Sequence, residues 1–345
     1  MKFSGKLQNE NKILQERLEE IMKVGLFGCG AYGMALSSIL IENNCDVTMW
    51  TKFEEEKKQL EETRQNERLI PNFKISEKIK LTTSVEKCIK GKDLLIVAIP
   101  AAFIDDLALE MEPHIKNNHI IIATKGIEQD TGLFINQIFE KHLSTRNIGV
   151  ISGPSFAIDL VSKMPAGLTL ASKKKKTREL AKKALANRYI KLRESTDVIG
   201  VEVCGSIKNV IALSAGMLEG MKANESTKAM LITEAMRDME EILFAFGAKK
   251  RTVDTFAGIG DLLLTCTSTK SRNYSFGKII GEKKSKEEIK EYLSKTTVEG
   301  FYTLESIYKL LKHKKVEIPI IDLIYDIAVE GLEPEALLTF LVEKN

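Results

Sequence analysis

The sequence predicts an α/β fold in two parts, a doubly wound sheet domain followed by an all-helical C-terminal domain. Short apolar runs alternate with helical patterns from residue 23 to about residue 196, which is typical of alternating strands and helices. After about residue 197 the strand patterns stop and only helical spacing continues. A glycine-rich turn joins the first apolar run to the first helical pattern.

The strands of the first domain are predicted from short runs that carry almost no charge. They lie at residues 24–27, 47–50, 94–100, 120–124 and 148–152, and the first helix is expected at 31–43. Runs that are apolar on both faces are typical of a parallel sheet covered by helices on each side. We therefore expect these strands to pair in parallel.

The second domain is predicted from helical spacing alone, interrupted by glycines. Its helices are expected at 198–218, 226–246, 273–280, 304–311 and 320–329. We divide the chain into a polar helical extension (1–22), a nucleotide-binding domain (23–197) and a helical substrate domain (198–345). The helix that begins near Val198 is expected to join the two domains directly.

Composition argues against several classes of function. The 51 basic and 48 acidic residues nearly cancel, which argues against a nucleic-acid partner, since that usually needs a concentrated basic surface. The four lysines at 173–176 adjoin a charged helical pattern, so we interpret them as solvated surface. No apolar run approaches the ~20 residues needed to span a bilayer.

The cysteines, the histidines and the N-terminus predict a cytoplasmic protein without a metal. Five cysteines without CxxC spacing indicate free thiols in a reducing compartment, and four scattered histidines indicate no metal site. The first 22 residues are charged throughout and lack the apolar segment of a signal peptide. Residues 9–21 resemble a short polar helix, either an extra arm or the product of an upstream start codon.

The glycine-rich turn has the sequence Gly-Cys-Gly-Ala-Tyr-Gly at residues 28–33. Gly28 permits a tight turn, Gly30 lets the backbone approach a pyrophosphate, and Gly33 lets helix and strand pack closely. The helix that starts at Ala31 and Tyr32 directs free N–H groups and a partial positive charge at the phosphates. In this context the motif predicts a Rossmann-type dinucleotide site.

Cofactor preference is predicted from the end of the second strand, about 20 residues later. NAD-selective sites usually have a carboxylate there, whereas this chain has Thr51 and Lys52. The residues at 54–56 are acidic but are expected to start the next helix. We interpret Lys52 as a partner for the 2′-phosphate of NADPH, with NADH tolerated. The alternative is an exposed lysine.

A catalytic lysine is predicted within the apolar helix at 198–218. Lys208 and Asn209 lie in its middle, where burial lowers the pKa of an amine towards neutrality and suits it to proton transfer. Asp261 could hold this amine, and Thr265 lies four residues further on the same helical face. The alternatives are a core ion pair for Lys208 and a helix cap for Asp261.

Two further groups of residues are predicted to contact the substrate. Ser271, Arg272 and Asn273 precede a helix and would bind an oxyanion, unless they are a surface arginine beside an N-cap. Lys125 and Gly153 follow two apolar strands, and the carboxyl ends of such strands line the ligand crevice.

Together these segments resemble the bacterial NAD(P)-dependent glycerol-3-phosphate dehydrogenases. The matching motifs occur in family order from about residue 23 to 335, at 28–36, 64–66, 98–100, 123–128, 152–157, 208–209, 255–265, 271–273 and 298–300. The resemblance implies interconversion of sn-glycerol 3-phosphate and dihydroxyacetone phosphate, a homodimer, and a role in supplying glycerophospholipid synthesis.

The resemblance also implies roles for single residues. Lys208 would be the acid/base. The residues near the reacting carbons or the substrate would be Lys125, Asp261, Thr265, Asn209, Asn273, Gly153, Ser155 and Ser271. Arg272 would bind phosphate and close on the cofactor. Pro100, Ala157 and Glu299 would lie at the nucleotide.

One departure from the family affects the expected substrate. Relatives usually carry a Gly-Tyr-Gly-Asp-Asn-like run where this chain has Met-Lys-Ala-Asn-Glu-Ser at 221–226, a segment that we expect to border the substrate region. Two other interpretations remain open: a reductase of another 2-keto or 3-hydroxy acid, and a non-catalytic protein that senses NAD(P).

Overall fold

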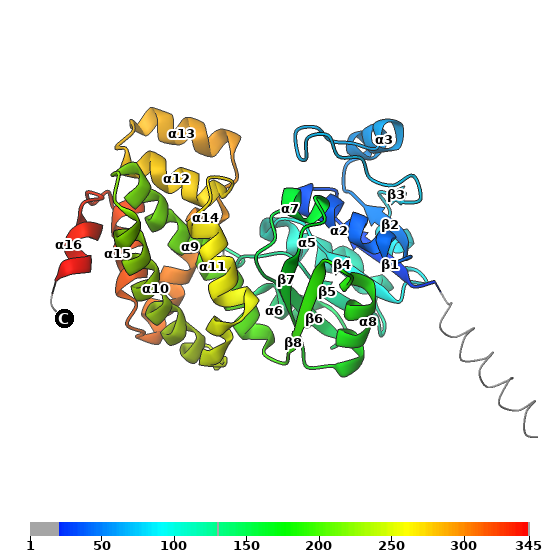
Figure 1. Cartoon of the computed structure of the whole chain (residues 1–345). Coiled ribbons are helices and arrows are strands. Elements are labelled where there is room, and N and C mark those ends of the chain that lie inside the picture. Colours follow the sequence, from blue (N-terminus) through cyan, green and yellow to red (C-terminus); the bar gives the residue numbers. More distant parts are fainter. Residues whose placement is uncertain (1–20, 130, 344–345) are drawn as a thin grey trace, which may run out of the picture.

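The computed structural model describes residues 21–129 and 131–343. It consists of a sheet domain and a helical domain side by side, joined by the start of the long central helix (Figure 1). Apart from its last two residues, the predicted N-terminal extension lies outside the described residues.

The sheet has eight strands in the order β3-β2-β1-β4-β5-β6-β7-β8. Their bounds are β1 (Lys23–Phe27), β2 (Asp46–Trp50), β3 (Lys80–Thr82), β4 (Leu94–Val97), β5 (His119–Ile122), β6 (Ile148–Ser152), β7 (Ala166–Ser172) and β8 (Ile190–Ser195). The five predicted strands pair in parallel, as expected. The sequence patterns missed β7, which runs antiparallel to β6. The sequence patterns also missed β3, which has only three residues, and the edge strand β8, whose polar residues resemble a loop.

Helices cover both faces of the sheet. Those of the first domain are α2 (Ala31–Glu42), α3 (Glu54–Thr63), α4 (Val85–Ile89), η1 (Ala101–Phe103), α5 (Ile104–Met111), η2 (Glu112–His114), α6 (Ile135–His142), α7 (Ala157–Val161) and α8 (Lys175–Leu185). The buried side chains of α2, α7 and α8 form one apolar cluster with the sheet, and those of α4, α5 and α6 form another. Burial on both faces explains why the central strands carry no polar alternation.

The second domain contains only helices and short helical turns. They are α9 (Val198–Gly220), α10 (Glu225–Ala245), η3 (Lys250–Asp254), η4 (Phe256–Gly260), α11 (Asp261–Cys266), α12 (Arg272–Gly281), α13 (Lys286–Lys295), α14 (Glu299–Lys314), α15 (Pro319–Ala328) and α16 (Ala336–Val342). The α/β sheet domain with an all-helical second domain confirms the predicted fold class.

Helix α9 is the core of the helical domain. Among the described residues it is the one helix long and apolar enough to cross a membrane, but 94% of its most apolar stretch is buried inside the protein. Its backbone lies against that of α12, since a Cβ added to Gly216 would fall 2.0 Å from the Tyr274 carbonyl oxygen. A Cβ added to Gly277 would fall 1.9 Å from that of Leu213. Glycines at this contact therefore allow an approach that side chains would prevent.

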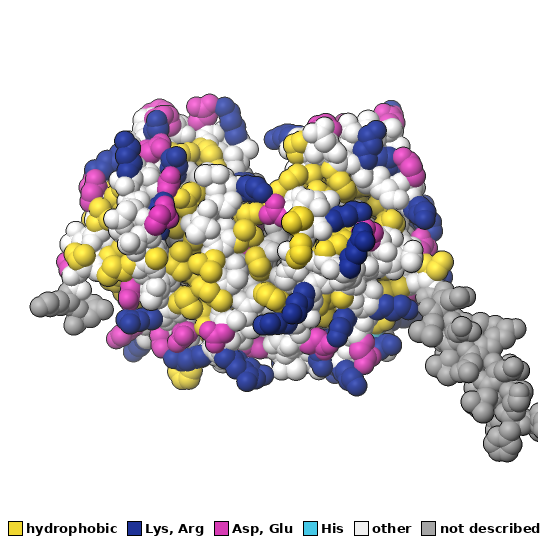
Figure 2. All heavy atoms as spheres, viewed as in Figure 1, with side chains coloured by type: hydrophobic (Ala, Val, Ile, Leu, Met, Phe, Trp, Pro, Cys, Tyr) yellow, Lys and Arg dark blue, Asp and Glu magenta, His cyan; other side chains and the backbone are white. Residues whose placement is uncertain are grey.

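The two domains leave a hollow between them. Figure 2 shows it on the side of the molecule where α3 and α13 lie. The hollow has one wall from each domain. The sheet domain contributes the carboxyl ends of its parallel strands and the N-termini of α2 and α7, and the helical domain contributes α11, α12 and α14.

Candidate active site

The glycine turn after β1 forms a cradle for a dinucleotide. Gly28 has a φ of +120°, and a Cβ there would lie 2.5 Å from the Ala98 carbonyl oxygen. A Cβ on Gly33 would lie 2.1 Å from the Gly28 oxygen, so α2 packs directly on the turn. Gly30 faces open space, with no atom within 4 Å of an added Cβ. The turn therefore fits a pyrophosphate at the N-terminus of α2, where Ala31 begins the helix.

A pocket of about 240 Å³ continues from this turn over the ends of β2 and β4. Lys52 and Pro100 line it, as the sequence predicts, and Lys52 lies 3.9 Å from Asp106 with half of its side chain exposed. Phe53 and Phe103 also line it and are 64% and 51% exposed. Exposed aromatic rings beside a pocket can stack on a base.

The sequence patterns missed these two phenylalanines and Glu56. Glu56 lines the same pocket and accepts a hydrogen bond from Thr51. A carboxylate and the Lys52 amine therefore lie at one site. Their positions shortly after strand ends, as aromatic or acidic residues, could have identified these three residues from the sequence.

Lys208, Asp261 and Lys125 form a buried cluster between the domains. The Lys208 amine lies 2.6 Å from one oxygen of Asp261, and the Lys125 amine lies 2.9 Å from the other. Thr265 accepts a hydrogen bond from Lys208 at 3.0 Å and donates one to the Asp261 carbonyl oxygen. Lys208 and Asp261 are at most 7% exposed through their side chains, and Lys125 is 18% exposed.

The charges in this cluster shift one another's pKa values. Burial, with a smaller contribution from the neighbouring Lys125, lowers the pKa of Lys208 to about 8, although Asp261 acts in the opposite direction. Burial would raise the pKa of Asp261, but the two amines hold it below its usual range. Burial would also lower the pKa of Lys125, yet Asp261 raises it above its ordinary value. Lys208 is therefore the amine suited to exchange a proton near neutral pH.

Local structure explains why these side chains meet. Lys125 follows β5 and Ser152 ends β6, so both lie at the carboxyl edge of the sheet. Asp261 is the first residue of α11, directly after the turn η4. Ser152 donates a hydrogen bond to it at 3.4 Å, which ties the sheet edge to the helical domain.

The strand β6 also leads to the predicted substrate residues Gly153 and Ser155. Ser155 donates a hydrogen bond to the Gly153 carbonyl oxygen at 2.9 Å. Its hydroxyl lies 3.1 Å from that of Tyr32 in the glycine motif, and Lys125 lies 6.0 Å above the Tyr32 ring. Ala157, at the start of α7, belongs to a helix that packs on α2. These contacts connect the nucleotide turn with the lysine cluster.

The predicted oxyanion residues lie at the start of α12. The Ser271 hydroxyl accepts a hydrogen bond from the Tyr274 amide and caps the helix, which is the alternative that we considered. The Asn273 side-chain oxygen accepts one from the Gly300 amide at 2.8 Å, beside Glu299 at the start of α14. Arg272 is exposed and pairs with no carboxylate in the part of the chain that the structure describes.

Asn209 follows Lys208 on α9 and is 5% exposed. Its side chain makes no hydrogen bond with any residue in 21–129 or 131–343. Its amide group is therefore available to a ligand.

Comparisons with known proteins agree with this geometry. The chain matches the family models of the NAD-dependent glycerol-3-phosphate dehydrogenase N-terminus over residues 23–178 and C-terminus over residues 197–339. The chain belongs to this dehydrogenase family. That result confirms the family, the oxidoreductase class and the nicotinamide cofactor predicted from the sequence.

Individual members of the family match nearly the whole chain. A glycerol-3-phosphate dehydrogenase [NAD(P)+] of Staphylococcus epidermidis is 32% identical over 94% of this chain and 98% of its own length. One of Agathobacter rectalis is 35% identical over 87% and 89%. The crystal structure of a glycerol-3-phosphate dehydrogenase from Coxiella burnetii superposes with a TM-score of 0.87 at 27% identity, covering 94% of this chain and 99% of that one.

The segment that departs from the dehydrogenase family does not border the lysine cluster. It joins α9 to α10 at the far end of α9. Gly220, the last residue of that helix, lies roughly 18 Å along its axis from Lys208. The neighbours of this end are the last turn of α12, not its first. Our expectation that residues 221–226 border the substrate is therefore wrong.

The sequence patterns did not identify Glu202, a buried acid near the lysine cluster. Glu202 is 5% exposed on α9 and accepts a hydrogen bond from the Asn136 amide at 2.9 Å, while its second oxygen has no partner among the described residues. Burial raises its pKa to about 8. It lines a cavity of about 10 Å³ together with Lys125 and Gly126, room for one water molecule.

Within residues 21–129 and 131–343, no group of three or more His, Cys, Asp or Glu side chains is arranged to hold a metal ion. The five cysteines are all buried and unpaired.

Proposed function

We propose that this chain interconverts sn-glycerol 3-phosphate and dihydroxyacetone phosphate, using NADPH or NADH, with Lys208 as the acid/base. The observation that carries the proposal is the buried Lys208 amine, 2.6 Å from Asp261, whose other oxygen binds Lys125. The Lys125 amine in turn lies 6.0 Å from the ring of Tyr32 in the dinucleotide turn. The bound nicotinamide supplies or accepts the hydride.

The residues of the cluster divide the proton chemistry between them. During reduction Lys208 donates a proton to the substrate carbonyl oxygen, because its pKa of about 8 keeps it protonated yet acidic near neutral pH. Lys125 stays protonated and stabilises the negative charge that develops on that oxygen. Asp261 orients both amines, and Asn209 positions the substrate hydroxyls.

The phosphate of the substrate binds at the start of α12. Arg272 supplies an unpaired guanidinium, and Ser271 and Asn273 fix the backbone around it. Gly153 and Ser155 complete the substrate site from the sheet. Remote binding energy at the phosphate then orients the carbonyl group for reaction.

We further propose that NADPH is preferred. Lys52 lines the nucleotide pocket where a 2′-phosphate would lie, and its exposed half is free to contact it. Glu56 and Asp106 in the same pocket weaken that preference, so NADH remains a substrate.

The test is the rate of NADPH oxidation by purified protein. Dihydroxyacetone phosphate should be reduced, whereas dihydroxyacetone and 2-keto acids of similar size should react at least about a hundredfold more slowly, since they cannot engage Arg272. Equal rates with a phosphate-free keto acid would refute the assignment.

We also propose that the enzyme is a cytoplasmic homodimer that supplies glycerol 3-phosphate to glycerophospholipid synthesis. Family membership supports this proposal. Sedimentation of the full chain at micromolar concentration would test the dimer, and a purely monomeric protein would refute it.

A further inference from the structure

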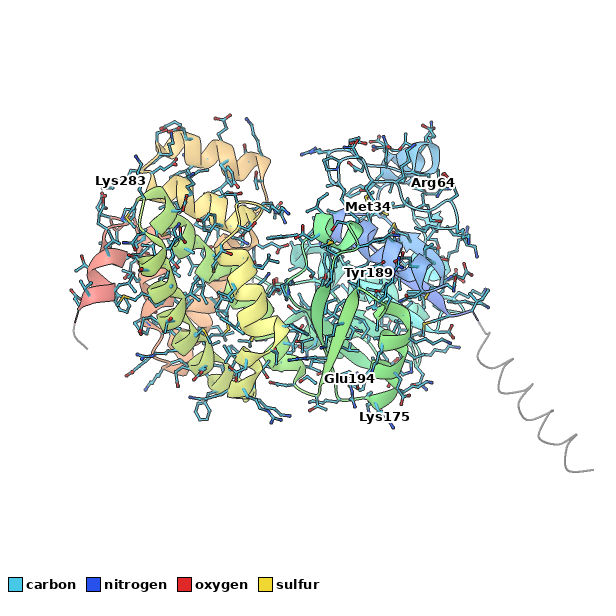
Figure 3. The ribbon with its side chains drawn as sticks, in the orientation of Figure 1. Met34, Arg64, Lys175, Tyr189, Glu194 and Lys283 are labelled. Atoms are coloured by element: carbon cyan, nitrogen blue, oxygen red, sulfur yellow. The ribbon has the colours of Figure 1, made fainter. Side chains whose placement is uncertain are left out.

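A second cavity, of about 420 Å³, lies at the junction of the domains. The middle of β7, the end of β8 and the short helix η3 line it. Figure 3 labels Glu194, one of its residues, at the opposite end of the sheet domain from Arg64, which directly follows α3. This cavity shares no residue with the nucleotide pocket and none with the lysine cluster.

Cations dominate the lining of the cavity. Arg178, Arg193, Lys249 and Arg251 face it together with the single carboxylate Glu194. Glu194 is already bonded to Arg178 at 3.0 Å and to Lys182 at 3.4 Å. Its negative charge is therefore shared between two cations and does not balance the remaining ones.

The remaining arginines are free of carboxylate partners. Arg193 stacks on the ring of Phe256 at 4.9 Å, and neither Arg193 nor Arg251 forms an ion pair with any residue that the structure describes. The side-chain amine of Lys249 donates a hydrogen bond to the Thr196 hydroxyl, at 3.2 Å, and to no carboxylate among the described residues. Three cations from two domains thus line one cavity without forming an ion pair with a carboxylate of the described residues.

Hydroxyl groups complete the lining. Threonines and a serine from both domains face the same cavity: Thr169, Ser195, Thr196, Thr252 and Thr255. Thr252 and Thr255 already donate their hydroxyl protons to Asp197 and to the Thr252 carbonyl oxygen. The hydroxyls of Thr169, Ser195 and Thr196 accept hydrogen bonds and keep their own protons for a ligand. Guanidinium groups and such hydroxyls together are donors that bind phosphate and carboxylate groups.

We propose that this cavity binds a small polyanion, of the class of phosphorylated metabolites, and that the bound anion ties the two domains together. Arg193 belongs to β8 of the sheet domain and Arg251 to η3 of the helical domain. One anion with two charged groups spans both, because both side chains line the same cavity.

Residues between the cavity and the lysine cluster connect the proposed anion site to the active site. Asp197 accepts hydrogen bonds from the Gly200 amide at the start of α9, from the Lys249 amide and from the Thr252 hydroxyl. The chain then runs through η3 and η4 directly to Asp261. An anion that fixes Arg193 and Arg251 therefore restrains the segment that carries Asp261.

Thermal unfolding with inorganic pyrophosphate tests binding, with saturating NADPH to occupy the glycine turn and in an Arg272→Gln background that weakens the substrate phosphate site. Pyrophosphate should raise the melting temperature of this protein, since a ligand that binds only the folded state stabilises it. Adding Arg193→Gln and Arg251→Gln should raise the concentration needed for half of the shift at least about tenfold. Both arginines are exposed, so their replacement leaves the core intact.

The matched control adds Arg68→Gln and Arg188→Gln, two exposed arginines outside the cavity, and should leave the pyrophosphate response unchanged. No shift in the Arg272→Gln protein, or an equal shift with and without Arg193 and Arg251, would overturn the proposal.

Amide hydrogen exchange tests the bridge separately. Pyrophosphate should slow exchange in η3 and β8, and unchanged exchange at saturating pyrophosphate would overturn the bridge while leaving a binding site. The binding measurements do not depend on the proposed substrate, so their failure and a failure of the dehydrogenase assignment are distinguishable.

Discussion

Replacing Lys208 by methionine separates its proposed role in proton transfer from any role in the fold. General acid catalysis contributes roughly 10²–10⁴-fold to a rate. We therefore expect Lys208→Met to lower kcat for dihydroxyacetone phosphate about a thousandfold, which corresponds to about 4 kcal/mol of activation free energy.

The stability of this variant should change little. Methionine has nearly the length of lysine, and the change removes an amine whose pKa burial already lowers. Asp261 keeps Lys125 at 2.9 Å and the Ser152 hydroxyl at 3.4 Å, so it is not left unpaired. The free energy of unfolding should stay within about 1–2 kcal/mol of the wild-type value.

The pH profile identifies the proton donor. Reduction needs the protonated amine, so the wild-type kcat/KM for dihydroxyacetone phosphate should fall as the pH rises through about 8. Oxidation of glycerol 3-phosphate needs the neutral amine and should accelerate over the same range. Both inflections should be absent from the residual activity of Lys208→Met.

The assay is stopped-flow and steady-state rates at about ten pH values between about 6 and 10. The control is Lys116→Met, at an exposed lysine. A variant that retains more than about a tenth of the wild-type rate would contradict the reasoning. The same holds for a variant that keeps the inflection near pH 8.

Three further changes test other parts of the structure. Lys52→Ala should raise the KM for NADPH about tenfold and leave that for NADH nearly unchanged, because only NADPH carries the 2′-phosphate; equal effects on both would contradict the assignment. Asp261→Asn should lower the free energy of unfolding at pH 7 by about 3–5 kcal/mol in urea titrations, because two buried amines lose their counter-charge. Gly277→Ala should cost about 3 kcal/mol or more, since the added Cβ would meet the Leu213 carbonyl.

Glu202→Gln gives a test of linkage between pH and stability. Burial raises the pKa of Glu202 from 4.5 to about 8, so the folded state holds a proton that the unfolded state releases. The wild-type protein should therefore lose stability relative to Glu202→Gln as the pH rises from 4.5 to about 8, and the difference should be constant above that. Parallel melting temperatures over this range would show that Glu202 is ionised when folded.

The fold was largely predictable because it repeats one local pattern. Central strands such as 94–97 are apolar on both faces because helices cover both faces of the sheet. Each strand can therefore be recognised from its own residues alone. The edge strand β8 was not predictable, since one exposed edge tolerates polar residues. The antiparallel pairing of β7 depends on the path of the chain between strands, which periodicity does not record.

The site was predictable only in its parts. Lys208 was identified because a charged residue in the middle of an apolar helix is costly unless it has a use. Phe53, Phe103 and Glu202 were missed because each has an ordinary explanation in the sequence, as a loop aromatic or a helical acid. Their significance depends on the pocket or cavity that they line.

The sequence by itself determined the alternating sheet, the glycine turn for a dinucleotide and the buried lysine, because each depends on residues close together in the chain. Only the tertiary structure decided that Asp261 would lie between Lys208 and Lys125, which are 53 and 136 residues away from it along the chain. Periodicity records which face of a helix or strand is buried, but the neighbour across that face is chosen by the packing of the whole chain. Chemistry that needs two amines on one carboxylate therefore exists only in the folded protein.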